Sequence, residues 1–165
     1  MSTPEIRLAT AADIPDLIAL ERASPEAPHW PETEYRGRLS PSEEEMQRCL
    51  LVAIVDGRVV GFAAARAVGD EAELESIAVD QAVRRQGIGR ALAVEVLAWS
   101  RQAGARTVLL EVRAASEGAQ RLYREVGFAT AGRRAGYYSA PGDDAIVMCL
   151  NLGAEAHTGT ADASG

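Results

Sequence analysis

The 165-residue sequence predicts a single α/β domain built on a mixed β-sheet of six to seven strands flanked by helices. Three observations point to this fold class: a length that suits one domain with a sizeable core, short apolar stretches that alternate with segments of helical periodicity, and two turn dipeptides. The dipeptides, Asp56-Gly57 and Gly69-Asp70, mark tight connections between consecutive strands. The predicted order is an early helical region, a three-stranded meander and then β-α-β-α-β-β.

The first part of the chain begins with a strand and then becomes helical. Glu5–Ala9 is a short predicted strand. Thr10–Asp13 is similar to a capping box, with Asp in place of the usual Glu or Gln, and apolar residues at helical spacing follow it. The three prolines of Ser24–Pro31 predict a loop. A second helical region with a break is predicted over Glu32–Leu39 and Ser42–Arg48.

The middle of the chain predicts three strands and a long helix. Leu50–Val55 and Arg58–Ala67 lie on either side of the first turn dipeptide, as the arms of a hairpin do. Glu73–Val79 follows the second turn as another strand. After residue 87, apolar side chains recur every three or four residues until Gly104, which predicts an amphipathic helix with one buried stripe.

The last part of the chain completes the sheet. Thr107–Arg113 is a predicted strand, and Ser116 is positioned to cap a short helix that runs through Val126. The final strands are predicted over Phe128–Tyr138 and Ala145–Leu152. The tail Gly153–Gly165 has no apolar pattern to bury and is expected to be disordered, so the domain is expected to span residues 1–152.

The composition argues against several classes of protein. A net charge of −7 disfavours general affinity for nucleic acid. No apolar run approaches the length of a membrane span, and the N-terminus lacks the basic-then-apolar pattern of a secretory signal. Cys49 and Cys149 have no metal-ligand spacing, and His29 has no partner His or Cys. These features predict a cytoplasmic protein without a metal ion, nucleic acid or membrane partner, and they leave its oligomeric state open.

One stretch, Val83–Leu92, places two arginines and two glycines between a predicted strand and a predicted helix. A tight glycine turn exposes backbone N–H groups at a helix N-terminus, where the helix dipole favours an anion. Arg84 and Arg85, just before the turn, add positive charge suited to a phosphate or pyrophosphate. The stretch therefore predicts a site for a phosphorylated cofactor.

Four interpretations of this loop compete. A P-loop needs Lys and then Ser or Thr after its last glycine, but Arg90-Ala91 follow Gly89. A dinucleotide fingerprint needs Gly or Ala where Leu92 stands, and Glu111, near the right distance for its acidic residue, lies inside a strand rather than at its end. The third interpretation is a plain glycine-rich turn with two solvated arginines. The fourth is an acetyl-CoA loop.

The fourth interpretation rests on a family resemblance. Arg84–Gly89 matches the acetyl-CoA loop of the GNAT superfamily, Gln/Arg-x-x-Gly-x-Gly/Ala, and Leu109–Phe128 resembles the strand and helix that follow it in that family. Tyr137-Tyr138 with Asp143–Ala145 resembles the last hairpin of protein N-terminal acetyltransferases, and Ala27–Pro31 looks like part of their substrate loop. The resemblance covers nearly the whole predicted domain and is closest to RimI-type ribosomal-protein-alanine N-acetyltransferases.

The resemblance implies a GNAT fold whose sheet splays at the acetyl-CoA site. It also implies direct transfer of an acetyl group from acetyl-CoA to the N-terminal α-amine of a ribosomal protein. A small-molecule amine acetyltransferase and a catalytically silent acyl-CoA-binding module are the alternatives. The residues implied in cofactor binding are Ile77, Ala78, Val79, Arg84, Arg85, Gln86, Gly87, Ile88, Gly89, Arg90, Ser116 and Tyr123.

Two residues carry the chemistry that the resemblance implies. Glu111 is the implied general base; a carboxylate in so apolar a strand is costly unless it is paired or used. The alternative is an ion pair between Glu111 and Arg113 on one face of the strand, and Glu75 is a second candidate base. Tyr123 is the implied acid that protonates the sulfur of CoA, and its alternative role is core packing.

The resemblance also implies an acceptor site and one departure from the family. The residues implied in acceptor binding are Trp30, Tyr35, Tyr137 and Tyr138. Ser116 stands where many relatives carry an Asn that helps to hold the cofactor, and Ser is shorter. An α-amine has a pKa near 8, compared with about 10.4 for lysine, so a modest base suffices more easily for a protein N-terminus. This favours the N-terminal amine without excluding small amines.

Overall fold

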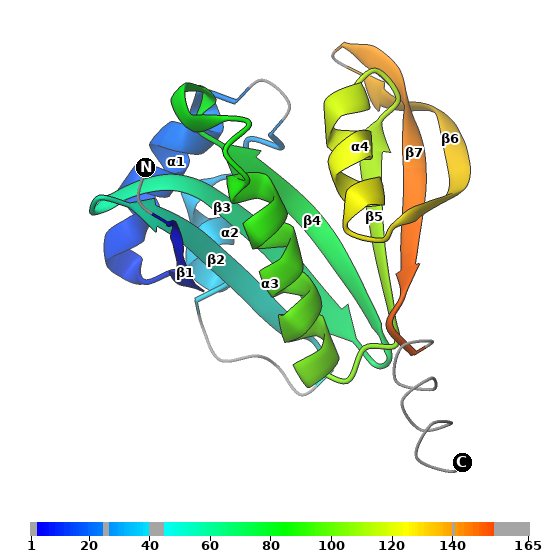
Figure 1. Ribbon diagram of the computed structural model, residues 1–165, viewed down its shortest axis with the longest axis horizontal. Coiled ribbons are helices and arrows are strands. Elements are labelled where there is room, and N and C mark those ends of the chain that lie inside the picture. Colours follow the sequence, from blue (N-terminus) through cyan, green and yellow to red (C-terminus); the bar gives the residue numbers. More distant parts are fainter. Residues whose placement is uncertain (1–2, 25–26, 40–44, 140, 154–165) are drawn as a thin grey trace.

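The structure, a computed structural model, describes residues 3–24, 27–39, 45–139 and 141–153. The strands in these ranges are β1 (Glu5–Leu8), β2 (Gln47–Val55), β3 (Arg58–Val68), β4 (Glu71–Val79), β5 (Thr107–Arg113), β6 (Ala129–Ser139) and β7 (Gly142–Asn151) (Figure 1). The helices are α1 (Ile14–Arg22), α2 (Glu32–Gly37), α3 (Ile88–Gln102) and α4 (Glu117–Glu125), with 3-10 turns η1 (Ala11–Asp13) and η2 (Gln81–Val83). Within these ranges, no helix combines the length and the apolar character that crossing a bilayer requires.

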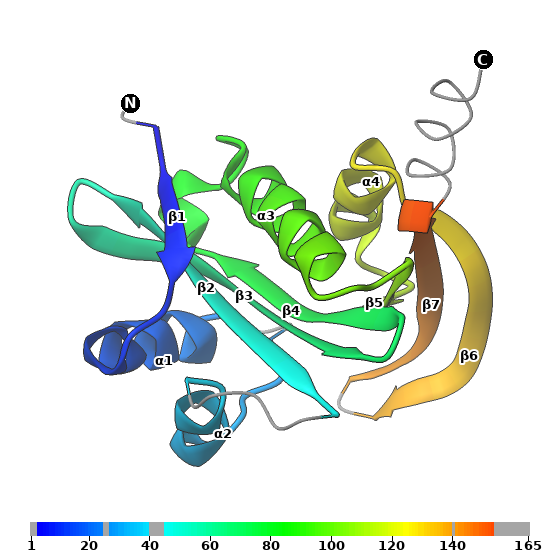
Figure 2. The same cartoon turned by 90° about the horizontal axis from the view of Figure 1, so that it is seen from below.

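One mixed sheet holds all seven strands, in the order β1-β2-β3-β4-β5-β7-β6. Neighbouring strands run antiparallel except for β4 and β5, which are parallel. Helices α3 and α4 cover one face of the sheet, and α1 and α2 lie against the other (Figures 1 and 2). The predicted mixed sheet flanked by helices is therefore confirmed.

Two apolar clusters fill the molecule, one on each face of the sheet. Successive side chains of a strand point to opposite faces, so in β3 Ala63 joins the cluster beneath α3 and Phe62 joins the cluster beneath α1 and α2. Gly61 brings β3 close to α3, because a Cβ at this position would lie 3.2 Å from Cδ1 of Leu92. The small residues of the central strand thus let the long helix pack closely on the sheet.

The sheet divides between β4 and β5. Their parallel ladder extends only from Glu71 opposite Thr107 to Glu73 opposite Leu109, and the strands then diverge (Figure 1). β4 stays paired with β3 as far as Val79, and β5 stays paired with β7 over its whole length. The sheet therefore splays at this point, as the resemblance implied.

A β-bulge accompanies the divergence. Leu74 of β4 lies opposite Ala65, and Ser76 lies opposite Ala64, so Glu75 is the extra residue in β4. A bulge bends its strand and increases the local twist. Its position just after the last residue paired with β5 suits a strand that turns away from its neighbour.

One predicted element is wrong. Within the predicted helix Ser42–Arg48, Gln47 and Arg48 belong to β2 and continue its ladder with β3. Pairing with a long partner strand extends β2 beyond the apolar run that marked it in the sequence, because backbone hydrogen bonds do not require apolar side chains at exposed positions. Residues 42–44 lie outside the described ranges, as do residues 154–165 of the tail that was expected to be disordered.

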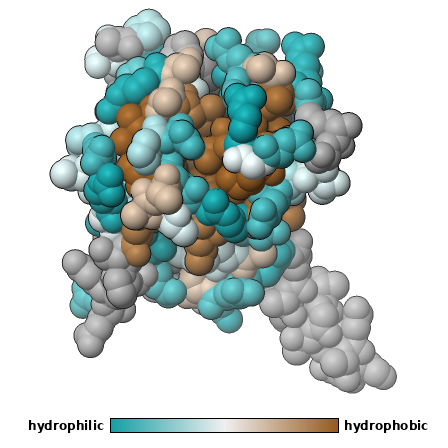
Figure 3. Space-filling view, turned by 90° about the vertical axis from the view of Figure 1, so that its left-hand side faces the viewer, coloured by the Kyte–Doolittle hydropathy of each residue, from teal (hydrophilic) through white to brown (hydrophobic). Residues whose placement is uncertain are grey.

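Among the described residues, β1 is the edge strand beside β2, and it has four residues. On the side of the molecule where β1 lies, an apolar area is bordered by hydrophilic side chains (Figure 3). Leu8, at the end of β1, is 63% exposed. A strand this short offers another chain little unpaired backbone to extend the sheet.

Asp13 ties β1 to the start of α1. Its carboxylate accepts hydrogen bonds from the Arg7 guanidinium at 2.7 and 3.0 Å and from the Thr10 backbone N–H at 2.8 Å. The hydrogen bonds from Arg7, together with those from Thr10, lower the pKa of Asp13 to about 2 against the opposing effect of burial. Because the folded pKa lies below the unfolded one, Asp13 stabilises the fold above about pH 4, and this contribution is lost as the pH falls through 2.

Replacing Asp13 by Asn is expected to lower the free energy of unfolding by about 2 kcal/mol at pH 7. The difference in free energy of unfolding between wild type and variant should narrow as the pH is lowered from 5 towards 2. Urea denaturation at several pH values measures this difference. Asp70→Asn, at an exposed turn position, is the control and should show neither effect. A gap that stays constant with pH would contradict the assignment.

Candidate active site

The loop between β4 and α3 has an unusual backbone. Arg85 and Gly87 both lie in the left-handed region, with φ values of 66° and 82°, and Gly87 is the N-cap of α3. Glycine adopts this conformation freely, whereas a non-glycine residue is strained there, and such strain clusters at ligand sites. Asp80 fixes the start of the loop, because its carboxylate accepts a hydrogen bond from the Ala82 N–H at 2.9 Å.

Backbone N–H groups at the start of α3 have no acceptor within the helix. The Ala91 N–H donates the first helical hydrogen bond, to the Gly87 carbonyl at 3.0 Å. The N–H groups of residues 88–90 therefore point out of the helix N-terminus, where the helix dipole adds partial positive charge. Arg84 and Arg85 lie beside them. This arrangement suits a phosphate or pyrophosphate group.

A cleft of about 730 Å³ lies between this loop, the end of β4 and α4. Most of the residues implied in cofactor binding line it. They are Ile77, Ala78, Val79, Arg84, Arg85, Gly87, Ile88, Gly89, Arg90 and Tyr123. Gln86 and Ser116, which were also implied, are not among the lining residues.

The main chain of β4 is available to a ligand in this cleft. The Asp80 N–H donates to the Val60 carbonyl at 2.8 Å, so the backbone groups of Asp80 point towards β3. Since backbone groups alternate in direction along an antiparallel pair, those of Val79 and Ile77 point away from β3. Beyond Glu73 no residue of β5 pairs with β4. A ligand lying along this edge can therefore hydrogen-bond to β4 as an additional strand would.

Helix α4 supplies lining residues that sequence reasoning missed. Gly118, Ala119 and Leu122 line the cleft together with Tyr123. A Cβ on Gly89 would lie 3.3 Å from Cδ2 of Leu122, so α3 and α4 approach closely here. Positions three and four residues apart share a helix face, so the spacing from Tyr123 back to Ala119 was the available signal. The other lining residues outside the implied set are Ser24, Ala27, Val83, Arg121 and Glu125.

Tyr123 is 8% exposed, and its ring meets that of Phe128 edge-on at 5.9 Å between centroids. The residue thus packs in the core and lines the cleft at once. Ser116 is the N-cap of α4, but its side chain makes no capping hydrogen bond, contrary to expectation. The side-chain amide of Gln120 instead ties the helix to two carbonyl groups at the end of β5, at 3.1 and 2.9 Å.

Glu111 lies on the opposite face of the sheet from α4. Its neighbours Leu110 and Val112 point into the cluster beneath α3 and α4, so Glu111 points to the other face. Its Oε1 lies 3.5 Å from a guanidinium nitrogen of Arg134 in β6. Its Oε2 is buried and has no hydrogen-bond partner within the described ranges.

The ion pair that Glu111 forms is with Arg134, and not with Arg113 as the alternative interpretation expected. The Arg113 guanidinium instead donates to the Pro141 carbonyl at 2.9 Å and lies over the ring of Tyr138, 4.2 Å from its centroid. Glu111 is therefore held from the neighbouring hairpin rather than from its own strand.

A bulge in β6 directs Tyr137 towards Glu111. Residues 135–137 of β6 oppose the single residue Asp144 of β7. The carboxylate of Asp144 fixes the bulge by accepting from the Gly136 N–H at 2.8 Å and from Arg133 Nε at 2.7 Å. The Glu111 carboxylate raises the pKa of Tyr137, first by accepting a hydrogen bond from its hydroxyl and then through its negative charge.

The Asp143-Asp144 motif therefore has a structural role. Besides the contacts of Asp144, the Asp143 carboxylate accepts from the Ala115 N–H at 3.0 Å. These acids fix the hairpin that carries Tyr137 and Tyr138, whose rings meet edge-on at 5.0 Å.

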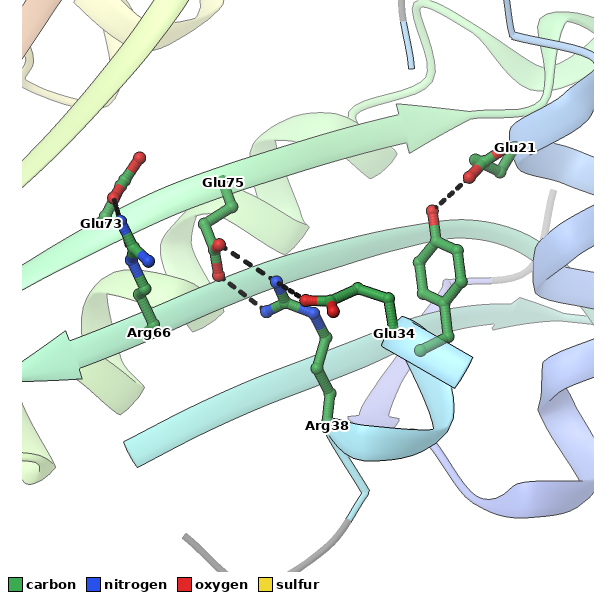
Figure 4. A network of polar contacts seen from close by, with 7 residues as sticks. Glu21, Glu34, Arg38, Arg66, Glu73 and Glu75 are labelled. Carbon is green, nitrogen blue, oxygen red and sulfur yellow. Dashed lines mark hydrogen bonds and ion pairs between the residues drawn. The ribbon is translucent and has the colours of Figure 1, made fainter. Parts of the chain in front are cut away.

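Glu75, the second candidate base, is engaged in an ion pair. The Arg38 guanidinium donates to both of its oxygens, at 2.7 and 3.0 Å, and to Glu34 at 3.2 Å (Figure 4). The Arg38 side chain is only 3% exposed. Arg38 thereby ties α2 to the bulge of β4. Within the described ranges, no group of three or more His, Cys, Asp or Glu side chains could hold a metal ion.

Two of the residues implied in acceptor binding lie on the α2 side. Trp30 is half-buried, with the Arg38 guanidinium over its ring at 4.4 Å. Tyr35 is fully buried, and its hydroxyl donates to Glu21 at 2.6 Å. Burial, followed by the hydrogen bond to Glu21, raises the pKa of Tyr35. Tyr35 therefore does not face an acceptor as expected; it packs beneath Trp30 at 5.5 Å between ring centroids.

Known proteins share this fold and sequence pattern. The family model described as "Acetyltransferase (GNAT) family" matches residues 14–128. A [ribosomal protein bS18]-alanine N-acetyltransferase of Escherichia coli (strain K12) is 41% identical over 99 residues, which cover 59% of this chain and 67% of that protein. The protein of the same name from Salmonella typhimurium is 35% identical over 150 residues, covering 89% and 97%.

A solved structure supports the same assignment. The crystal structure of the ribosomal-protein-S18-alanine N-acetyltransferase from Escherichia coli superimposes with a TM-score of 0.77 at 32% identity, covering 91% of this chain and 94% of that one. The glycine loop and the splayed strands β4 and β5 lie within the residues that the family model matches. This chain belongs to the GNAT family of acetyltransferases.

Proposed function

We propose that this chain transfers the acetyl group of acetyl-CoA directly to the N-terminal α-amine of a protein. We propose further that its acceptor is the N-terminal alanine of ribosomal protein bS18, in the cytoplasm. The proposal rests on the positions of two side chains at the point where the sheet splays. Tyr123 lines the cleft on one face of the sheet, and Glu111 lies on the other face. The Salmonella typhimurium relative, whose name gives this acceptor, is matched over 97% of its length.

The cleft has the donors that coenzyme A requires. The N–H groups at the start of α3, with Arg84 and Arg85, would hold the pyrophosphate, and the main chain of Ile77 and Val79 would hold the pantetheine arm. Gly89 leaves room beside this passage, because a Cβ at this position would lie 3.3 Å from Cδ2 of Leu122. The thioester would then lie near Tyr123 at the splay.

The chemistry requires three proton movements. Glu111 takes a proton from the α-ammonium of the acceptor, and the neutral nitrogen attacks the carbonyl carbon of the thioester. The C–N bond forms, the C–S bond breaks, and Tyr123 gives its proton to the departing sulfur. The nitrogen then loses its second proton, which restores the hydroxyl of Tyr123. The products are an acetylated amine and the free thiol. The buried, unpartnered Oε2 of Glu111 supports its role, because such an oxygen is costly unless a ligand satisfies it.

The acceptor would lie between the two sides of the open face. Tyr137 and Tyr138 would contact its first peptide unit from the β6–β7 hairpin, and Trp30 would do so from the loop before α2. Tyr35, buried beneath Trp30, would position that ring without touching the acceptor.

An acceptor assay tests the proposed substrate. Labelled acetyl-CoA is incubated with three kinds of acceptor, and the products are identified by mass spectrometry. The acceptors are peptides with the N-terminal sequence of bS18, the same peptides with a blocked N-terminus and a free lysine, and small amines. We expect the label on the N-terminal alanine only. If small amines are labelled in preference to the peptide, the chain is a small-molecule amine acetyltransferase. If no acceptor is labelled although CoA binds tightly, the chain is a catalytically silent acyl-CoA-binding module.

Glu111→Gln is expected to lower kcat roughly 10²- to 10⁴-fold, because it removes the group that takes the proton. Affinity for CoA should be unchanged, since Glu111 does not line the cleft. Calorimetry and steady-state kinetics measure the two quantities.

Glu75→Gln is the comparison for Glu111→Gln. It breaks one of the hydrogen bonds from Arg38, so it should lower stability while the folded enzyme keeps its turnover. The opposite pattern, in which only the change at Glu75 abolishes turnover, would transfer the role of base to Glu75.

Gly87→Ala is expected to weaken binding of CoA roughly tenfold, because the strained backbone misaligns N–H donors to a charged group. Its matched control is Gly69→Ala, which has a similar positive φ, 61° against 82°, and equally open space for a Cβ. Both changes should lower stability by about 1 kcal/mol. Equal CoA affinity in the two variants, measured by calorimetry, would argue against the loop as the pyrophosphate site.

A further inference from the structure

The acceptor face holds a cation that the proposed mechanism does not use. Arg134 of β6 is the partner of the Glu111 carboxylate, with 3.5 Å between its guanidinium nitrogen and Oε1. The other charged or titratable groups around this carboxylate are Tyr137 and Tyr138 of β6, Arg113 of β5 and Glu73 of β4. Arg113 is bound to the Pro141 carbonyl, and Glu73 is paired with Arg66 at 2.7 Å.

The contact of Arg134 with Glu111 is loose. Its 3.5 Å is long for a charge-assisted hydrogen bond, and the Arg134 side chain is 59% exposed. The neighbouring Arg133, which is equally exposed, forms a close ion pair with Asp144 at 2.7 Å. Arg134 also begins the bulged part of β6, beyond which regular pairing with β7 stops until Tyr138. Its other contact, with the ring of Tyr137, is distant at 5.7 Å from the centroid. The guanidinium can therefore move away without breaking the fold.

We infer that Arg134 is a displaceable counter-ion of Glu111, standing in the acceptor-free enzyme where the α-ammonium of the acceptor binds. This inference rests on the proposed role of Glu111 as the base. Both groups are N–H cations, and a carboxylate with one buried, unpartnered oxygen has room for a donor at Oε2 once Arg134 leaves Oε1. Binding of an acceptor thus exchanges one cation for another at Glu111.

Two consequences follow for the acceptor. It must carry a cationic amine to replace Arg134, so a neutral hydroxyl or amide of similar size binds poorly. It must also compete with Arg134, so removing that side chain strengthens binding of the acceptor. If Arg134 instead held the acceptor, its removal would weaken binding.

The test compares Arg134→Gln, the charge-preserving Arg134→Lys and the control Arg36→Gln, at an exposed arginine of α2 that pairs with Glu32. Calorimetry with an α-amino peptide, in the presence of CoA, measures acceptor affinity. Arg134→Gln should tighten peptide binding about two- to fivefold, as expected for an exposed ion pair.

Arg134→Lys should bind the peptide about as tightly as the wild type, and so should Arg36→Gln. In a Glu111→Gln background, Arg134→Gln should have no effect on peptide binding. Weaker or unchanged peptide binding in Arg134→Gln would overturn the inference. The binding measurement does not require turnover, so a wild-type enzyme that acetylates no α-amine would refute the proposed function while this measurement still decides the role of Arg134.

Discussion

The short ladder between β4 and β5 is the constraint on which the rest of the molecule depends. Only three residue pairs join these strands, from Glu71–Thr107 to Glu73–Leu109. Each strand keeps its other partner, β3 or β7, so the fold tolerates the gap. Backbone groups in a sheet interior need hydrogen-bond partners. The outward-facing main chain of Ile77 and the N–H of Val79 therefore remain for a ligand, while the Val79 carbonyl accepts a long hydrogen bond from Arg84 Nε at 3.4 Å.

Contacts on both sides keep the two halves of the sheet in these positions. On the β4 side, Arg38 binds the bulge residue Glu75 through two hydrogen bonds (Figure 4). The Arg38 guanidinium also lies over the ring of Trp30. On the β5 side, Asp144 fixes the bulge of β6 that brings Tyr137 to Glu111. The acceptor face is thus built from two separately fixed edges, which explains why its polar residues come from elements far apart in the chain.

Features set by local sequence could be predicted. The turn dipeptides and the helical periodicity gave the hairpin and α3, and the cleft was largely predictable because Arg84–Arg90 are contiguous. Features set by tertiary register could not. Arg134 rather than Arg113 meets Glu111 because of the register in which β6 pairs with β7, which no local pattern marks. The buried hydroxyl of Tyr35 finds its partner in Glu21, which lies 14 residues earlier in α1. The start of β2 depends on the length of β3.

Amide hydrogen exchange of the backbone of β4 tests the central claim most directly. If coenzyme A lies along the unpaired edge, saturating acetyl-CoA should slow exchange at Ile77 and Val79, while Ala63 of β3 and Val108 of β5, already within their ladders, should change little. Unchanged exchange at Ile77 and Val79 under saturating acetyl-CoA, with protection appearing elsewhere on the surface, would contradict the account.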